Sequence, residues 1–305
     1  MKYLKIPNSN LTVSEIALGC MRLSELNLEE AERLILSAVA SGINFFDHAD
    51  IYGGGKSEAI FGEILKRNPD LRKEIIIQSK CGIREGYYDS SLEHILASVD
   101  ASLERLNTNY LDVLLIHRPD ALTDFEEVAR AFKKLREDKK VRYFGVSNMN
   151  SVQIEILQKY LPNKLIFNQL QFNLVHSLMI DEILNVNMKN DAAINRAAGI
   201  LDYMRLHDIT MQAWSPLQIS LQEGTYLNHP DYPKLNAKLE EIGKKYQLTP
   251  AATAIAWILR HPANIQVIVG TTKLSHLQEL VKASGIELTR KEWYELYLSA
   301  DKFLP

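Results

Sequence analysis

The sequence of 305 residues predicts one α/β domain, residues 1–305, folded as a (β/α)8 TIM barrel with an N-terminal β-hairpin. Eight short apolar runs rich in β-branched residues recur along the chain, and stretches with helical spacing separate most of them, as in βα units. The first run is followed by LGCMRLSEL, without the GxGxxG or GxxxxGKS turn usual in an open doubly wound sheet. No linker, repeat or low-complexity segment divides the chain, so a single barrel explains its length.

The predicted elements begin with a short hairpin that turns at PNSN, residues 7–10, and covers one end of the barrel. Eight strands follow, at residues 14–19, 44–49, 74–80, 111–117, 141–147, 165–171, 209–215 and 265–271. Runs such as LDVLLIH are almost continuously apolar, as expected for strands that have the barrel core on one side and a helix on the other. The longest irregular connection is expected at residues 173–195, after the sixth strand.

Helices are predicted between the strands. In residues 28–42 an apolar stripe includes Leu34 and Ile35, and Gly42 is expected to end the helix. Residues 91–107 and 123–138 show the same spacing. These helices would surround the strands and complete the barrel.

Composition excludes several classes of protein. The chain is 46% hydrophobic and 24% charged, which suits a globular protein with a substantial core. A net charge of −3 offers no electrostatic surface for nucleic acid or an anionic membrane, so the expected partner is a small molecule. The chain has only two cysteines, Cys20 and Cys81, and they form no CxxC pattern, so neither a disulfide nor a structural zinc site is expected. It also has no apolar run like that of a signal peptide or a membrane span, so a cytoplasmic location is expected.

Polar residues stand at the carboxyl ends of the predicted strands, where a barrel of this type builds its site. In chain order they are Asp47, His48 and Tyr52, then Lys80, His117, Ser147 and Asn148, then Asn168, Gln169 and Gln171, then Trp214 and Ser215, then Gly270, Thr271, Thr272 and Lys273. Any one of them taken singly is more often a solvated loop side chain than a catalyst. The whole set favours an active site.

Four of these residues suggest an acid catalyst. An amine such as Lys80 at a barrel mouth needs a partner, and Asp47 can pair with it. Lys80 could then approach Tyr52, and its positive charge is expected to lower the pKa of the phenol by two or more units. His117 could face the same point from the next strand. A phenol tuned in this way would serve carbonyl reduction.

At this point the sequence resembles the aldo-keto reductase family, most closely its bacterial general oxidoreductases. FFDHADIY followed by KSEAIFGEIL, then IIIQSK, LDVLLIH, FGVSN, FNQ, AWSPL and VIVGTTK, stand in the family's order and at its spacing across nearly the whole chain. The resemblance implies that Tyr52 is the proton donor and that Lys80 and Asp47 tune it. It also implies that His117 orients the substrate carbonyl.

The resemblance further implies a binding site for a nicotinamide cofactor. Its expected residues are Met21, Arg22, Asp47, Ser147, Asn148, Gln169, Trp214, Ser215, Pro216, Leu217, Gly270, Thr271, Thr272, Lys273 and His276. Ser147, Asn148 and Gln169 would hold the carboxamide, since their side chains include donors and acceptors. Trp214 would stack on the nicotinamide, where the family often has tyrosine.

The adenosine end departs from the family pattern. His276 stands where many members carry an arginine, and Leu280 stands where an asparagine often contacts adenine. Lys273 can still pair with a 2′-phosphate as a point charge, so NADP(H) is favoured over NAD(H). His276 is either a partial substitute for the arginine or a helix-surface histidine.

The predicted reaction is reduction of an aldehyde or ketone by hydride from the nicotinamide and a proton from Tyr52. The loops after the strands, including 173–195, would select the substrate, whose identity stays open. By resemblance alone the enzyme is expected to be a monomer.

Three other functions would use some of the same residues. A Schiff-base aldolase could use Lys80 but would need neither Tyr52 nor the amide set. A metal hydrolase could use Asp47, His48, Asp50 and His117, although His48 and Asp50 are expected to face away or to cap the loop, and no metal is predicted. A nicotinamide-binding regulatory subunit with little turnover is the main alternative, although all four catalytic residue types are present.

Overall fold

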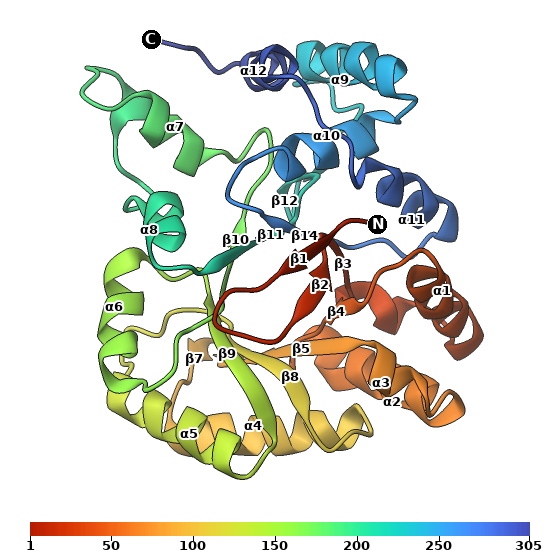
Figure 1. The fold of residues 1–305 in the computed structure, drawn as a ribbon, viewed down its shortest axis with the longest axis vertical. Helices are drawn as coiled ribbons and strands as arrows, with labels where there is room; N and C mark the ends of the chain where they lie inside the picture. Colours follow the sequence, from red (N-terminus) through yellow and green to blue (C-terminus); the bar gives the residue numbers. More distant parts are fainter.

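A closed barrel of eight parallel strands forms the centre of the molecule, as the computed structural model, which describes residues 1–305, shows (Figure 1). All eight predicted strands are confirmed. They are β3 (Ile16–Gly19), β4 (Phe45–Asp47), β5 (Ile76–Cys81), β8 (Leu111–Ile116), β9 (Val141–Ser147), β10 (Phe167–Gln171), β11 (Thr210–Trp214) and β14 (Gln266–Val269). They lie around the barrel in chain order, and β14 pairs with β3 to close it.

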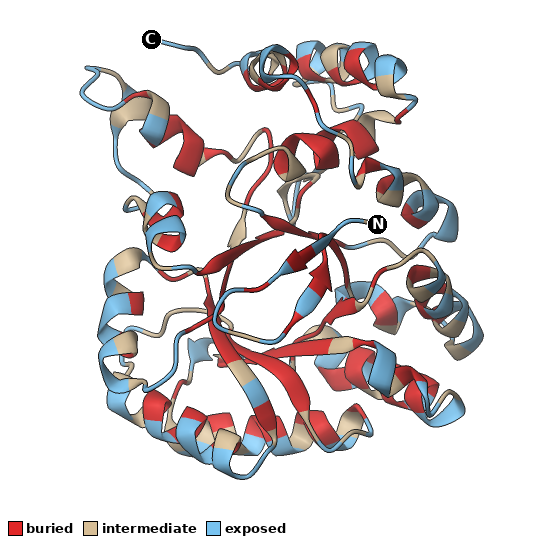
Figure 2. Ribbon diagram, in the orientation of Figure 1, coloured by how far each residue is buried: buried red, intermediate tan, exposed pale blue.

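Helices surround these strands. The longer ones are α1 (Leu28–Ala40), α2 (Lys56–Arg67), α4 (Leu92–Arg105), α5 (Phe125–Glu137), α6 (Ser151–Tyr160), α9 (Pro233–Tyr246), α10 (Pro250–Leu259) and α12 (Arg290–Ser299). The shorter ones are α3 (Leu71–Glu74), α7 (Leu178–Leu184), α8 (Ile200–Leu206) and α11 (Leu274–Leu280), with 3-10 turns η1 (Met21–Glu25), η2 (Tyr52–Gly55), η3 (Asp191–Ala193) and η4 (Val281–Ala283). Buried residues face the strands and exposed ones lie on the outer faces of the helices (Figure 2).

The ends of α1 illustrate how the sequence sets these helices. Asn27 and Glu30 form a capping box, which satisfies backbone donors at the start of the helix. Gly42 has φ of 87°, a conformation that favours glycine and stops the helix where the sequence predicted.

The N-terminal hairpin, β1 (Tyr3–Lys5) with β2 (Thr12–Ser14), is also confirmed and lies across the barrel (Figure 1). Its Leu4 and Val13 pack in one apolar cluster with Phe45 and Phe167, the first residues of β4 and β10. The hairpin therefore covers the amino ends of the strands. The carboxyl ends are left to build the site.

One prediction about the loops was wrong, and two short hairpins were missed. The segment 173–195 is not irregular throughout, because it contains α7 and η3. Two small hairpins were not predicted, β6 (Ile83–Arg84) with β7 (Tyr87–Tyr88) after β5, and β12 (Gln218–Ser220) with β13 (Gly224–Thr225) after β11. Strands of two or three residues are too short to show the alternation that marks a strand. No helix has both the length and the apolar character needed to cross a bilayer.

Candidate active site

Lys80 joins the residues predicted to catalyse. Its ammonium donates to Asp47 Oδ2 at 2.8 Å, to the Tyr52 hydroxyl at 3.1 Å and to the carbonyl of His48 at 2.9 Å. Lys80 and Asp47 are buried, whereas Tyr52 is half-buried and lines a cavity. The lysine therefore holds the phenol at the boundary between the core and the cavity.

The loop after β4 is held in place by β5. The amide of His48 donates to the carbonyl of Gln78 at 2.8 Å, and the amide of Asp50 donates to the carbonyl of Lys80 at 3.0 Å. These bonds continue the pairing of the two strands beyond the end of β4. They place Tyr52, at the start of η2, over the side chain of Lys80.

The predicted fall in the pKa of Tyr52 was wrong. Burial raises the pKa of the phenol, and although the positive charge of Lys80 lowers it as expected, Asp47 adds to the rise and the net shift is upward. Burial would lower the pKa of Lys80, but Asp47 and Tyr52 raise it above its ordinary value. Tyr52 is thus protonated and Lys80 charged at neutral pH. A protonated phenol beside an ammonium suits a proton donor.

His117 lies beside Tyr52, with the two rings perpendicular and their centroids 5.9 Å apart. Burial, Lys80 and Arg118 together hold the pKa of the imidazole well below its usual range, so the ring is neutral at pH 7. A neutral imidazole has one N–H donor. His117 lines the cavity and can offer that donor to a substrate oxygen near the phenol.

Asp47 is held from its other side by two amides. Its Oδ1 accepts from Gln78 Nε2 at 2.6 Å and from Gln169 Nε2 at 3.0 Å. With Lys80 on Oδ2, the carboxylate receives three donors. Asp47 is thereby fixed in the orientation that meets the lysine.

These amides belong to a larger network that the sequence did not reveal. Gln78 and Gln169 also donate to Gln212 Oε1, at 2.9 and 3.0 Å. Gln212 donates to Gln266 Oε1 at 2.8 Å, and Gln266 donates to the carbonyl of Ser14 at 2.8 Å. This glutamine network, formed by Gln78, Gln169, Gln212 and Gln266, crosses the barrel interior from the hairpin to Asp47. The only signal in the sequence is a glutamine within each of four apolar strands.

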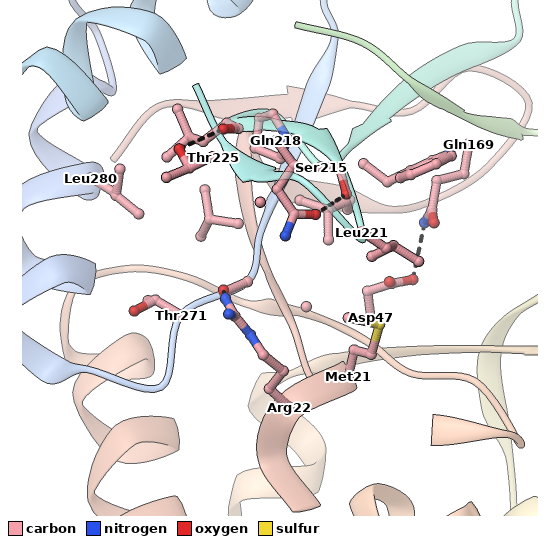
Figure 3. A pocket seen from close by; sticks show the side chains of 18 of the residues that line it. Met21, Arg22, Asp47, Gln169, Ser215, Gln218, Leu221, Thr225, Thr271 and Leu280 are labelled. Atoms are coloured by element: carbon pink, nitrogen blue, oxygen red, sulfur yellow. Dashed lines mark hydrogen bonds between the residues drawn. The ribbon is translucent and has the colours of Figure 1, made fainter. Parts of the chain in front are cut away.

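A cavity of about 740 Å³ opens at the carboxyl ends of the strands (Figure 3). Most of the predicted cofactor residues line it, namely Met21, Arg22, Asp47, Ser147, Asn148, Gln169, Trp214, Ser215, Pro216, Leu217, Gly270, Thr271 and His276. Thr272 and Lys273 do not, and Lys273 is exposed at the start of α11. Leu280 does line the cavity.

The residues expected to hold the carboxamide are already hydrogen-bonded to one another. Asn148 accepts from Trp214 Nε1 at 3.1 Å and donates to Ser147 Oγ at 2.8 Å, while Ser147 donates to the carbonyl of Gln169 at 2.8 Å. Both N–H groups of Gln169 are engaged with Asp47 and Gln212, so its Oε1 is the group left for a ligand. Gln169 thus offers an acceptor to the cavity.

The other end of the cavity has its own contacts. Arg22, from η1, donates through Nη2 to the carbonyl of Gly270 after β14, and Figure 3 shows the arginine reaching that segment. Ser215 Oγ donates to Gln218 Oε1 at 2.6 Å. The first contact joins the loops after β3 and β14, the second lies within the loop after β11, and all four residues line the same cavity.

The side chains of His48 and Asp50 do not line the cavity, in agreement with the expectation that they face away or cap the loop. His48 is buried, packs edge-on against Phe61 at 4.6 Å between ring centroids, and has no partner for either ring nitrogen. Burial raises the pKa of Asp50 to about 6, and one of its buried oxygens is also without a partner. Asp47 is paired with Lys80, so the side chains of DHAD, residues 47–50, do not converge on one point as a metal site would require. No three His, Cys, Asp or Glu side chains are grouped as metal ligands.

Comparisons with known proteins agree with this geometry. Residues 15–297 match the model of the Aldo/keto reductase family. The chain is 36% identical to YcsN, an uncharacterised oxidoreductase of Bacillus subtilis, and 36% identical to a 6-dehydroglucose reductase of Agrobacterium fabrum, with 96% of both chains covered in each case. The crystal structure of a thermostable aldo-keto reductase, Tm1743, with the inhibitor epalrestat has a TM-score of 0.79 at 25% identity, covering 98% of this chain and 100% of that one.

Proposed function

Because the chain belongs to the aldo/keto reductase family, we propose that its Tyr52 protonates the carbonyl oxygen of an aldehyde or ketone during reduction with NADPH. Carbonyl reduction with a nicotinamide cofactor follows from the family and from the oxidoreductases among its relatives. The roles of individual residues and the choice of NADPH belong to the proposal. The observation that carries it is the contact of Lys80 with both Asp47 and Tyr52 at the floor of the cavity.

The residues of the cavity fit a nicotinamide cofactor. The free oxygen of Gln169 suits a carboxamide N–H, and the ring of Trp214 offers a flat surface for stacking. Arg22, at the opposite end, supplies positive charge for phosphates. When bound, the reduced cofactor supplies the hydride.

The chain supplies the position and the proton. His117 and Tyr52 face the same space, so a carbonyl oxygen between them receives one donor from each. Tyr52 gives its proton to that oxygen, and Lys80 stabilises the phenolate that remains. Asp47 keeps Lys80 charged and in place while this occurs.

The preference for NADPH rests on Lys273, which is exposed beside the cavity-lining Thr271 and donates its amide to the Thr271 hydroxyl at 3.1 Å. Glu279 and His276 line the same end, and Glu279 carries a charge that opposes binding of a 2′-phosphate. We expect the attraction between Lys273 and the 2′-phosphate to outweigh the repulsion from Glu279, because the ammonium of Lys273 can move to the phosphate.

The test is NADPH oxidation with a panel of aromatic aldehydes and diketones, followed by kcat/KM for NADPH and NADH. We expect turnover that a chelator does not remove, and a preference for NADPH that falls about tenfold in Lys273→Ala. Lys282→Ala, which removes another lysine of the same region, serves as the control and should keep the ratio. An unchanged ratio in Lys273→Ala would show that Lys273 makes no phosphate contact. Tight NADPH binding without any turnover would instead favour the regulatory subunit.

The finer predictions of a monomer and a cytoplasmic location are also proposed. Both cysteines are free and buried, as a reducing compartment permits. Size-exclusion chromatography with light scattering tests the monomer. A stable dimer at micromolar concentration would contradict it.

A further inference from the structure

Arg118 is a cavity residue that the proposed reaction does not use. It follows His117 directly after β8 and lines the cavity. Its guanidinium makes no hydrogen bond or ion pair with the protein, and its nearest aromatic contact is the ring of Trp214, with 5.6 Å between the guanidinium carbon and the ring centroid. A guanidinium offers five donors and no acceptor, so Arg118 presents an unused set of donors to the cavity.

The order of the strands places Arg118 away from the expected phosphates. Around the closed barrel, β8 and β14 are separated by three strands on either side, so they lie opposite each other. Gly270, Thr271 and His276 follow β14, and Arg22 reaches to the carbonyl of Gly270 on that side. Arg118 therefore stands across the barrel, beside the residues proposed to act on the carbonyl.

The charge of Arg118 is also uncompensated. Asp47, on the catalytic side of the cavity, is committed to Lys80. Glu279, the other acidic lining residue, lies on α11 after β14 and so belongs to the opposite side. A cation without a carboxylate partner in a partly enclosed cavity favours an anionic ligand.

Apolar side chains from three loops also line the cavity. Ile51 precedes Tyr52, Ile83 comes from the β6–β7 hairpin and Leu221 from the turn of the β12–β13 hairpin, and all three line the cavity together with Trp214. Such side chains offer no hydrogen bonds to the hydroxyl groups of a sugar. They suit an apolar body that carries one charged group.

We propose that Arg118 is a specificity-determining residue and that the substrate is a carbonyl compound with an apolar body and an anionic group, such as a carboxylate. The inference rests on the proposed carbonyl reduction at Tyr52. The anion would pair with Arg118 while the carbonyl oxygen lies between Tyr52 and His117. Reduction itself is unchanged, because Arg118 holds the part of the substrate that does not react.

The experiment compares para-carboxybenzaldehyde with its methyl ester, which has a similar shape and no charge, using NADPH as reductant. The native enzyme should have the higher kcat/KM with the carboxylate. Arg118→Met should lower kcat/KM for the carboxylate by about 10- to 100-fold, as expected for loss of a hydrogen-bonded charge pair. For the ester the change should stay within about threefold, and Arg118→Lys should restore part of the loss. Arg84→Met, which removes an exposed cation on the neighbouring β6, should leave the ratio of the two substrates unchanged.

Each other result has a distinct meaning. If Arg118→Met lowers kcat/KM equally for the carboxylate and the ester, or if the native enzyme does not prefer the carboxylate, the inference is overturned while carbonyl reduction stands. Glyceraldehyde, an uncharged substrate with two hydroxyl groups, is assayed as a third substrate. If Arg118→Met lowers kcat/KM for glyceraldehyde and not for the carboxylate, Arg118 recognises hydroxyl groups and the anionic substrate is wrong. If the native enzyme reduces none of the three, the proposed function fails, and the inference fails with it.

Discussion

At the scale of single residues, burial and charge act on Tyr52 in opposite directions. Lys80 lowers the pKa of the phenol, but burial raises it by more, so the folded protein keeps the group protonated. In the proposed reaction, Lys80 would thus favour the phenolate once the proton has left. The pKa of Tyr52 is therefore not lowered in the resting enzyme. A phenol that stays protonated suits a proton donor, which must hold its proton until a substrate accepts it.

His48 provides a residue-scale test of stability against pH. Burial and the charge of Lys80 lower its pKa from 6.5 to about 3. Between these values the unfolded chain binds the proton more strongly, so His48 favours unfolding as the pH falls through this range and has no such effect above it. From pH 7 to pH 5 the native protein should lose about 2 kcal/mol through this residue.

His48→Leu should remove that part of the pH dependence, because leucine cannot be protonated and suits the site against Phe61. The measurement is the free energy of unfolding in urea at the two pH values. His229→Leu, which removes a partly exposed histidine, is the control and should keep the native slope. An equally steep loss of stability in His48→Leu would contradict the assignment.

At the scale of elements, the glutamine network links four strands to Asp47. Gln212 is its centre, since it accepts from Gln78 and Gln169 and donates to Gln266. Gln212→Met keeps the length of the side chain and removes its hydrogen bonds. The partners left buried and unsatisfied should lower the free energy of unfolding by about 1–3 kcal/mol.

The same variant should lower kcat about tenfold, because the amides that orient Asp47 lose their second partner. Steady-state kinetics with kcat and KM determined separately provide the measurement. Gln171→Met, on β10 but outside the cavity lining, is the control and should retain kcat. A lower melting temperature with unchanged kcat in Gln212→Met would restrict the network to a structural role.

The elements themselves were largely predictable. The apolar and β-branched residues of a run such as VRYFGVS predict a strand, and β9 occupies the predicted residues. The network was not predictable, because a nearly continuous apolar run does not say which residues face the barrel interior. Gln78 faces inward to Asp47, whereas its neighbour Ser79 donates to Glu58 of α2. That alternation is visible only once the register of the barrel is known.

At the scale of the whole molecule, closure of the barrel brings distant residues to one end. Tyr52, Lys80 and His117 come from three successive strand ends, so their meeting could be inferred from strand order alone. The pKa of Tyr52 could not be inferred from strand order, since it depends on how far the surrounding loops exclude water. The contact of Arg22 with Gly270 likewise requires the closed barrel, because β3 and β14 meet only at its seam.

The central claim is that Tyr52 donates the proton, and Tyr52→Phe tests it most directly. The variant removes the hydroxyl that accepts a hydrogen bond from Lys80 and keeps the aromatic ring beside His117. Single-turnover oxidation of bound NADPH should be slower by about 10²- to 10⁴-fold, with NADPH affinity, followed by tryptophan fluorescence, within about twofold of the native value. A rate within about threefold of the native enzyme would contradict the claim, because general acid catalysis by Tyr52 should contribute more than that.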